Sequence, residues 1–252
     1  MSSPVLVLAD IHGNFHALKA VLSDALGDYE SIWVLGDVVG YGPDPKKCLE
    51  TLIRCGATMV AGNHDLAVCG QVGLDDFNSE ARFVLEKHQK EFNANQKEFL
   101  SKLPWTRKER SVTLSHGNPL NPIWGYVLNE STAFQVLKQS ETSLTLIGHS
   151  HIPGLWELNP DMGLQYRSIE LNTPMDYSGH PHLANPGSVG QSRDGSHQAQ
   201  YLIVQPERKI LEFRRCSWKH RPVRRKMQRK GYPSTLIERM APLSSSRFFH
   251  FS

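Results

Sequence analysis

Five short apolar runs in this chain each lead directly into Asp, His or Asn residues. The run at residues 32–35 passes through Gly36 to Asp37, and its composition is that of a buried strand. Open α/β sheets bind ligands just beyond the ends of such strands, so the repeated pattern predicts one shared site. The polar residues at the five strand ends include no cysteine and are Asp10 and His12, Asp37, Asn63 with His64 and Asp65, His116, and His149 with His151.

Helical patterns follow the first strand ends. Apolar residues recur at helical spacing from Phe15, and Asn14 precedes them as an N-cap. After Asp37 a Gly- and Pro-rich loop ends in Asp44, a predicted N-cap, with Pro45 at the first helical position. The polar residues therefore lie in loops that join strands to helices.

Residues 66–110 interrupt this alternation with two polar helical stretches, at 79–92 and 95–103. We interpret the segment at about 70–104 as an inserted helical pair that covers one side of the site. After a helix at 132–139, the second half is rich in strand patterns and ends in two short helices. The predicted strands are 154–158, 166–171, 182–184, 200–204 and 209–214, and the helices are 223–230 and 234–240.

The length of 252 residues suits one domain with additions, which we place at residues 1–218, followed by a basic C-terminal tail at 219–252. The N-terminus lacks the features of a signal peptide, and no apolar stretch is long enough to span a membrane. The four cysteines form no CxxC pair, which indicates free thiols in a reducing compartment. We therefore expect a cytoplasmic protein.

The net charge of +3 is unevenly distributed. Residues 207–230 carry 11 Lys and Arg against two Glu, a net charge of +9 that leaves −6 on the rest of the chain. Such a block can bind nucleic acid, but it has few interleaved aromatic residues, so a solvated helical face is the favoured interpretation.

Asp, His and Asn without Cys form a ligand set for divalent Mn, Fe, Zn, Ni or Mg. Seven such groups are too many for one catalytic ion that keeps an open position. Two ions that share a bridging carboxylate explain the number, and Asp37 lies between the other clusters. A pair of ions about 3.5–4 Å apart can hold the attacking and leaving oxygens of a displacement at phosphorus. The residues thus predict hydrolysis of a phosphate ester.

The residues that follow the five predicted strands also resemble, in order and spacing, the five motifs of the calcineurin-like metallophosphoesterase superfamily. Residues 36–45 and 185–191 further resemble its small bacterial and archaeal phosphodiesterase-like branch, and the resemblance covers about residues 4–215. The motifs are Asp10-x-His12, Gly36-Asp37, Gly62-Asn63-His64-Asp65, His116 and Gly148-His149-Ser150-His151.

This resemblance implies an α/β (α+β) fold: a four-layer αββα sandwich of two mixed sheets flanked by helices, with a dinuclear site at the strand ends. It implies two divalent ions, with manganese expected first, and a hydroxide between them that attacks phosphorus. His64 would contact the phosphate or protonate the leaving oxygen. One ion would take Asp10, His12, Asp37 and His151, and the other would take Asp37, Asn63, His116 and His149.

The sequence departs from the family pattern after the bridging Asp. Ser/Thr protein phosphatases and symmetrical diadenosine tetraphosphate hydrolases have an Arg there, and the former also have an Asp that orients the catalytic His. Residues 38–41 contain neither. Asp65 or Asp44 could orient His64 instead, and Arg193 of the Gly-rich loop could contact phosphate, although a surface Arg is a comparable interpretation.

The other histidines and two asparagines are not expected to bind metal. Asn14 and Asn185 are interpreted as residues that support turns or ligands. Among the histidines, His182 is the strongest further candidate because it lies close to the Asn185 loop. The remaining histidines are His16, His88, His180, His197, His220 and His250.

The leading hypothesis is a cytosolic two-metal phosphoesterase with a phosphate-ester substrate, and phosphodiesters are preferred over phosphoproteins. A phosphomonoesterase or protein phosphatase is the alternative within this chemistry. A nuclease or RNA-processing enzyme would use the basic tail and bind nucleic acid in a salt-dependent way. A non-catalytic scaffold of the same fold is a further alternative, against which the intact ligand set and His64 argue.

Overall fold

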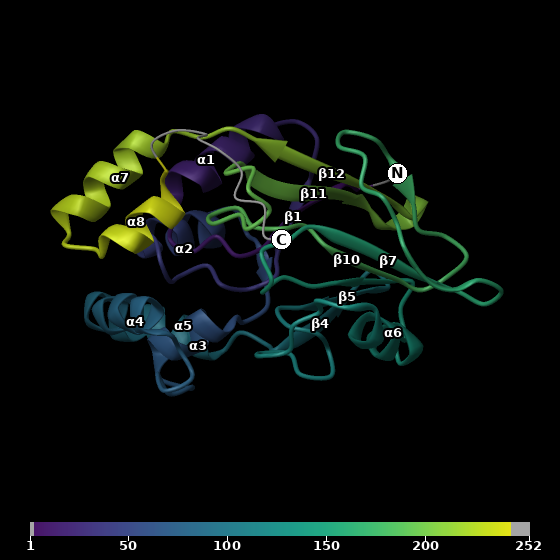
Figure 1. The fold of residues 1–252 in the computed structure, drawn as a ribbon, viewed down its shortest axis with the longest axis horizontal. Coiled ribbons are helices and arrows are strands. Elements are labelled where there is room, and N and C mark those ends of the chain that lie inside the picture. The colour runs from purple at the N-terminus through teal and green to yellow at the C-terminus, as the bar shows by residue number, and fades with distance from the viewer. Residues whose placement is uncertain (1–2, 243–252) are drawn as a thin grey trace, which may run out of the picture.

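The computed structural model describes residues 3–242 of the chain. In this part of the chain two mixed sheets of six strands each pack together, and helices lie on their outer sides (Figure 1). This arrangement confirms the predicted αββα sandwich. The first sheet has the order β3-β2-β1-β11-β12-β9, with bounds Thr58–Met59, Ser31–Val34, Val5–Leu8, Ala199–Gln205, Ile210–Cys216 and Met175–Asp176. The second has the order β4-β5-β6-β10-β7-β8, with bounds Thr106–Glu109, Val112–Ser115, Leu144–Leu146, His182–Asn185, Gly154–Asn159 and Gly163–Tyr166.

Strand β1 shows why the sheets stack in this way. All four of its side chains are buried. Since successive residues of a strand point to opposite faces of the sheet, both faces must be covered at β1. Val5 and Val7 belong to the core between the two sheets, whereas Leu6 and Leu8 pack in the core that includes helices α1 (Phe15–Asp24) and α2 (Pro45–Arg54). Strands β1, β2 and β3 run parallel, as do β5, β6 and β10, so each set ends at one edge of its sheet.

The first two helices begin where the sequence predicts. The Asn14 side chain accepts a hydrogen bond from the Ala17 N–H and caps α1. Helix α2 begins at Pro45 with Asp44 at the N-cap position, as predicted, but the Asp44 side chain makes no capping hydrogen bond. Its carboxylate forms an ion pair with Lys226 instead.

The segment after β3 carries three helices, with a non-helical stretch at residues 70–78 between the first and the second. The predicted helical pair is present as α4 (Ser79–Glu91) and α5 (Ala94–Ser101). A third helix, α3 (Asn63–Cys69), precedes them and was not predicted, because β3 has only two residues and the helix begins on the polar residues that follow it. Asn63 and His64 therefore lie in the first turn of a helix.

In the second half, α6 (Glu130–Lys138) and strands β7, β10, β11 and β12 form close to the predicted bounds. The predicted strand at 166–171 is wrong, since β8 ends at Tyr166 and only Leu171 makes an isolated bridge, to Phe213. Strands β4 and β9 were not predicted, because their residues show no apolar alternation.

The two C-terminal helices, α7 (His220–Arg229) and α8 (Ser234–Met240), lie at the same end of the molecule as α4 and α5 (Figure 1). Their apolar side chains, among them Val223, Met227 and Ile237, join the core that also contains α1 and α2. The four cysteines are free, with Cys48 buried and Cys55 exposed. Within residues 3–242 no helix is long and apolar enough to cross a membrane. His250 lies outside the described residues.

Candidate metal centre

All seven predicted metal ligands converge where the parallel strands of the two sheets end. The first sheet supplies residues that follow β1, β2 and β3, and the second supplies residues that follow β5 and β6. Every one of these side chains is buried, with at most 5% of the residue surface exposed. The converging residues are Asp10, His12, Asp37, Asn63, His116, His149 and His151.

The ligand atoms fall into two groups. In the first group, His12 Nε2 lies 3.0 Å from His151 Nε2, and His151 Nε2 lies 3.4 Å from Asp10 Oδ1. In the second group, His116 Nε2 lies 3.0 Å from both Asn63 Oδ1 and His149 Nδ1. Two ligand atoms of one ion, each about 2.0–2.2 Å from it, lie about this far apart.

Asp37 connects the two groups. Its Oδ2 atom lies 3.5 Å from His12 Nε2 and 3.5 Å from His116 Nε2. Its Oδ1 atom accepts a 2.9 Å hydrogen bond from the backbone N–H of His64, in the first turn of α3. The carboxylate is therefore fixed between the two groups of ligand atoms.

The distal nitrogens of three histidines show which ring atoms are available to a metal. His12 Nδ1 lies 3.1 Å from Val39 O, His116 Nδ1 lies 2.9 Å from Leu35 O, and His151 Nδ1 lies 2.7 Å from Gln191 O. A backbone carbonyl can only accept, so each Nδ1 carries the proton and each Nε2 presents its lone pair to the centre. Lone pairs facing each other at 3.0 Å are what a bound cation requires, so the residues fit a metal site.

The backbone at the site adopts a conformation that non-glycine residues rarely adopt. Positive φ angles between 47° and 68° occur at five of the candidate ligands. Each such residue costs about 1–3 kcal/mol, and strain of this kind concentrates at functional sites. The five ligands with positive φ are Asp10, His12, Asp37, His149 and His151.

The interior of the site disfavours charge on these side chains. Burial raises the pKa of Asp10 to about 7 and raises the pKa of Asp37 well above its usual value. Burial also lowers the pKa of His149 to about 2 and lowers those of His12 and His151. A divalent cation would stabilise the carboxylates as anions and the imidazoles as neutral ligands. The electrostatics thus agree with the donor set.

His64 stands beside the shared carboxylate. Its Nε2 atom lies 4.0 Å from Asp37 Oδ2, close enough to form a further group of ligand atoms with Asp37 and His12. Its ring packs among those of Tyr41, Phe77 and His12, with centroids 4.7–5.1 Å apart. The position allows either contact with a substrate or metal binding.

Neither predicted partner orients the His64 ring. Asp65 accepts hydrogen bonds from the backbone N–H groups of Val39 and Gly62, and Asp44 pairs with Lys226. Within residues 3–242, His64 Nδ1 has no hydrogen-bond partner. The ring is instead confined sterically, and a Cβ at residue 40 would lie only 2.3 Å from this nitrogen, which explains Gly40.

The Gly-rich loop after β10 supports the ligands through the backbone. Ser188 Oγ donates to Asp10 O at 2.7 Å, and Asn185 Nδ2 donates to Gly148 O at 2.8 Å, next to His149. Asn14 Nδ2 donates to Gly190 O at 2.9 Å. The two asparagines thus have the supporting contacts predicted for them.

Two side chains lie at the rim of the centre. Arg193, on the same loop, is exposed, and its positive charge lowers the pKa values of Asp10 and Asp37. Tyr126 stacks on the ring of His149 and was missed at the sequence level. The sequence held a signal for a functional role of Tyr126. It is an aromatic residue in a loop rich in Pro, Gly and Asn, where few helix or strand residues are near it to pack against.

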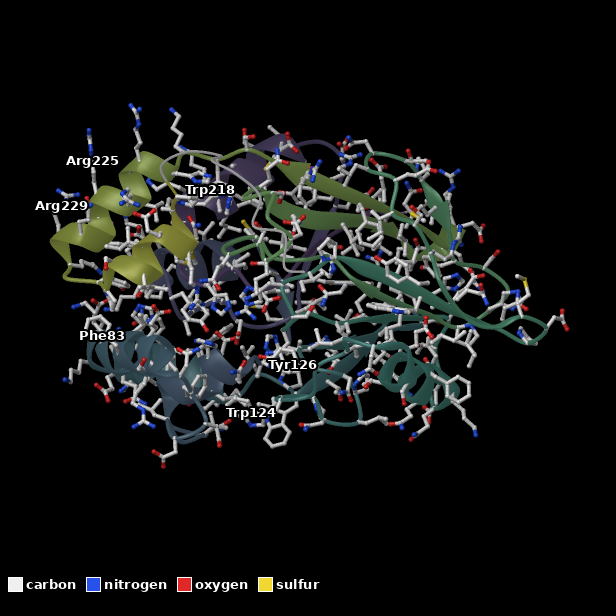
Figure 2. All side chains as sticks on the ribbon, in the orientation of Figure 1. Phe83, Trp124, Tyr126, Trp218, Arg225 and Arg229 are labelled. Carbon is white, nitrogen blue, oxygen red and sulfur yellow. The ribbon has the colours of Figure 1, made fainter. Side chains whose placement is uncertain are left out.

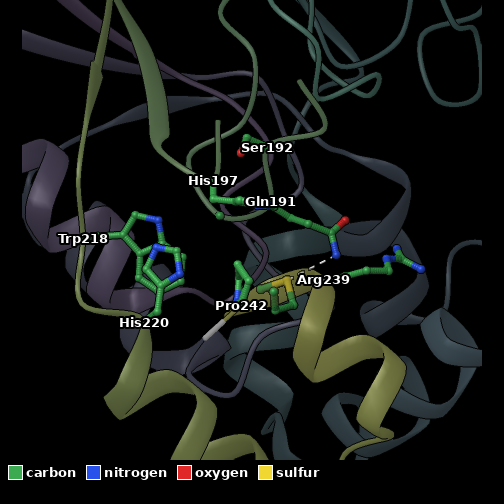
Figure 3. A pocket seen from close by; sticks show the side chains of 9 residues that line it. Gln191, Ser192, His197, Trp218, His220, Arg239 and Pro242 are labelled. Atoms are coloured by element: carbon green, nitrogen blue, oxygen red, sulfur yellow. Dashed lines mark hydrogen bonds between the residues drawn. The ribbon is translucent and has the colours of Figure 1, made fainter. Parts of the chain in front are cut away.

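The C-terminal helix α8 reaches this loop. Gln191 Nε2 lies 3.3 Å from Met240 Sδ, at a small pocket of about 10 Å³ that is also lined by Arg239 and by the stacked rings of Trp218 and His220 (Figure 3). Since the Gln191 carbonyl also holds His151 Nδ1, one residue connects the tail to a candidate ligand.

The other histidines described lie outside the groups of ligand atoms. His182, the strongest further candidate, faces Glu157 Oε2 at 3.2 Å. His88 is buried in α4 near Tyr232, and His220 stacks on Trp218.

Comparison with known proteins places this geometry in a family. In sequence, an uncharacterized protein of Methanocaldococcus jannaschii is 33% identical over 246 residues, 95% of this chain and 98% of that protein. A symmetrical bis(5'-nucleosyl)-tetraphosphatase of Erwinia tasmaniensis is 25% identical over 170 residues, 62% of this chain and 60% of that protein. The chain thus spans less than two thirds of that tetraphosphatase.

Comparison with solved structures gives the same relationship. A metallophosphoesterase from Sphaerobacter thermophilus superposes with a TM-score of 0.84 and 34% identity, over 96% of this chain and 99% of that one. A hypothetical protein from Pyrococcus horikoshii, with a TM-score of 0.75 and 20% identity over 95% and 98% of the two chains, shares the fold. The model of the calcineurin-like phosphoesterase superfamily domain matches residues 4–209. This chain therefore belongs to the calcineurin-like phosphoesterase superfamily.

Proposed function

We propose that this protein is a metal-dependent phosphoesterase that hydrolyses phosphodiesters. The observation that carries the proposal is the position of Asp37 Oδ2, 3.5 Å from a histidine Nε2 in each of the two ligand groups. One carboxylate oxygen placed symmetrically between two sets of ligands is the arrangement that a pair of ions requires.

The seven candidate ligands would divide between two divalent ions, for which manganese is our first expectation. When bound, the ions would polarise the phosphoryl group and lower the pKa of a water molecule so that it can attack phosphorus. His64 would contact the phosphate or protonate the leaving oxygen, and Arg193 would hold a phosphate oxygen. One ion would bind Asp10, His12, Asp37 and His151, and the other would bind Asp37, Asn63, His116 and His149.

The preference for diesters is supported by the resemblance of residues 36–45 and 185–191 to the phosphodiesterase-like branch and by the lack of an arginine at residues 38–41. A phosphomonoesterase or protein phosphatase is the alternative, and the ratio of diester to monoester hydrolysis decides between them. We expect the reaction in the cytoplasm.

A nuclease is a second candidate because three arginines on α7 are exposed four residues apart, at 221, 225 and 229, and so share one side of the helix. Arg225 and Arg229 point away from the body (Figure 2). Other cations of the tail are paired within the protein, such as Lys226 with Asp44 and Lys230 with Glu91. Binding of a single-stranded oligonucleotide that weakens steeply with salt would favour the nuclease, and binding insensitive to salt would exclude it.

The deciding experiment measures hydrolysis of bis(p-nitrophenyl) phosphate and p-nitrophenyl phosphate after chelation and again with Mn²⁺ restored. We expect turnover only with Mn²⁺, faster on the diester, and none from Asp37→Asn. Asp75→Asn is the matched control, because that carboxylate is 99% exposed on the surface. Two bound ions without turnover of either ester would indicate a narrow substrate, whereas a protein that binds no metal would support a non-catalytic scaffold.

A further inference from the structure

Tyr126 presents an aromatic surface beside the candidate metal centre. Its ring stacks on that of His149 with the centroids 3.9 Å apart and an angle of 19° between the planes. The residue is nevertheless 44% exposed. Because the imidazole covers one face of the phenol ring, the exposed surface belongs to the other face and the ring edges.

The loop that carries Tyr126 is held in shape by its own hydrogen bonds. Gly117 N–H donates to Pro122 O at 2.6 Å, and Asn118 N–H donates to Gly125 O at 2.8 Å. A Cβ at Gly125 would lie 2.2 Å from Asn118 Nδ2, so the turn needs glycine there. The neighbouring Trp124 packs on Phe77, which in turn contacts His64, and Figure 2 shows Trp124 and Tyr126 together. A ring presented by such a loop loses little entropy on binding.

A positive charge lies next to this ring. The backbone N–H of Arg193 donates a 3.2 Å hydrogen bond to His151 O, and the positive charge of its side chain lowers the pKa values of Tyr126, Asp10 and Asp37, against the effect of burial. The rim therefore combines a flat apolar surface, a cation and candidate metal ligands. A ligand that uses all three has a planar ring and an attached phosphate.

We propose that Tyr126 is a specificity-determining residue whose open face stacks on the base of a nucleotide, with the phosphate of that nucleotide between Arg193 and the metal centre. The substrates would then be phosphate esters of nucleosides. This inference rests on the proposed phosphoesterase function and specifies its substrate class. A base stacked on an aromatic side chain should improve affinity about 10-fold over the same sugar phosphate without a base.

Binding, rather than turnover, tests this proposal. The Mn²⁺-loaded protein is titrated by calorimetry with adenosine 5'-monophosphate, ribose 5-phosphate and inorganic phosphate. We expect adenosine 5'-monophosphate to bind about 10-fold more tightly than ribose 5-phosphate. If either ester is turned over during the titration, the ratio of the two KM values gives the same comparison.

Three variants assign the effect to the ring. Tyr126→Phe should keep the preference for the nucleotide, and Tyr126→Leu should lose it while its affinity for inorganic phosphate and its metal content stay unchanged. Tyr166→Leu is the matched control, since Tyr166 is 56% exposed on β8 and packs on Trp156. It should keep the preference.

Equal affinities for the nucleotide and the sugar phosphate in the unmodified protein would overturn the proposal. Loss of metal from Tyr126→Leu would also overturn it, because the ring would then serve only to position His149. A lack of Mn²⁺-dependent hydrolysis of every phosphate ester tested, nucleotides included, would reject the proposed function without affecting the binding comparison, so the two failures are distinguishable.

Discussion

His64 contacts Asp37 through two different groups. Its backbone N–H donates a 2.9 Å hydrogen bond to Asp37 Oδ1, whereas its ring Nε2 lies 4.0 Å from Asp37 Oδ2. The first contact depends only on the start of α3 and would survive any change of the side chain other than to proline. The position of the shared carboxylate is therefore separable from the chemistry of the imidazole.

We predict that His64→Ala retains both metal ions but lowers kcat by about 10²–10⁴-fold, the usual contribution of general acid catalysis. The loss should be largest for esters with poor leaving groups, because these depend most on protonation of the leaving oxygen. Metal analysis and kinetics on a series of esters measure the two effects. His16→Ala, on the half-buried side of α1, is the matched control.

Loss of metal from His64→Ala would assign His64 to the ligands. The ring is close enough for this, since its nitrogen forms a group with a nitrogen of His12 and a carboxylate oxygen of Asp37. If kcat of His64→Ala depended on the leaving group in the same way as kcat of the unmodified protein, this result would likewise contradict the role of His64 as an acid.

The fold and the convergence of the candidate ligands were predictable because they follow from local patterns. An apolar run such as residues 32–35 identifies a strand, and parallel strands deliver their ends to one edge, so Asp10 and His151 could be placed together although 141 residues separate them. The positive φ angles at these two residues could not be predicted from the sequence, because this backbone strain is imposed by the tertiary structure.

Other features depend on contacts that no local pattern encodes. Asp44 has the sequence position of a helix cap, yet it pairs with Lys226, 182 residues away, because α7 packs against its loop. Tyr126 lies ten residues after His116, and its place on His149 follows from the path of the loop between β5 and α6. Such loop and tail contacts required the structure.

Arg193→Ala should raise KM by about 10-fold and lower kcat less. Its guanidinium acts on the carboxylates of the centre from an exposed position, so it is suited to holding a phosphate oxygen in both the bound and the transition state. Steady-state kinetics at two salt concentrations measure the effect. Arg225→Ala, an exposed arginine on α7, is the control, and an unchanged KM in Arg193→Ala would exclude phosphate binding by Arg193.

Lys226→Met should destabilise the protein by about 1–3 kcal/mol. The Asp44 side chain is only 7% exposed, so removal of the ammonium group leaves a buried carboxylate without its partner. The double variant Asp44→Asn/Lys226→Met should recover part of the loss, because it removes the unpaired charge. Denaturant unfolding of the two single variants and the double variant measures the coupling, and Arg225→Met is the surface control. Additive single effects would show that the pair contributes nothing.

His88 should make the protein less stable at acidic pH. It is fully buried on α4, and burial together with the charges of Lys230 and Lys87 lowers its pKa to about 3, against 6.5 for an exposed histidine. Between these values the unfolded chain binds a proton that the folded protein does not. The stabilisation by neutral His88 is therefore complete above pH 6.5 and decreases as the pH falls toward 3, by about 2 kcal/mol at pH 5.

His88→Gln stays neutral over this range, so its free energy of unfolding should fall less steeply between pH 7 and pH 5 than that of the unmodified protein. Both proteins keep the candidate ligands, whose titration cancels when the two curves are subtracted. Urea unfolding of the Mn²⁺-loaded proteins at several pH values gives the difference. Parallel curves would mean that His88 accepts its proton in the folded state at an ordinary pH, which would require the tail near Tyr232 to open and admit water.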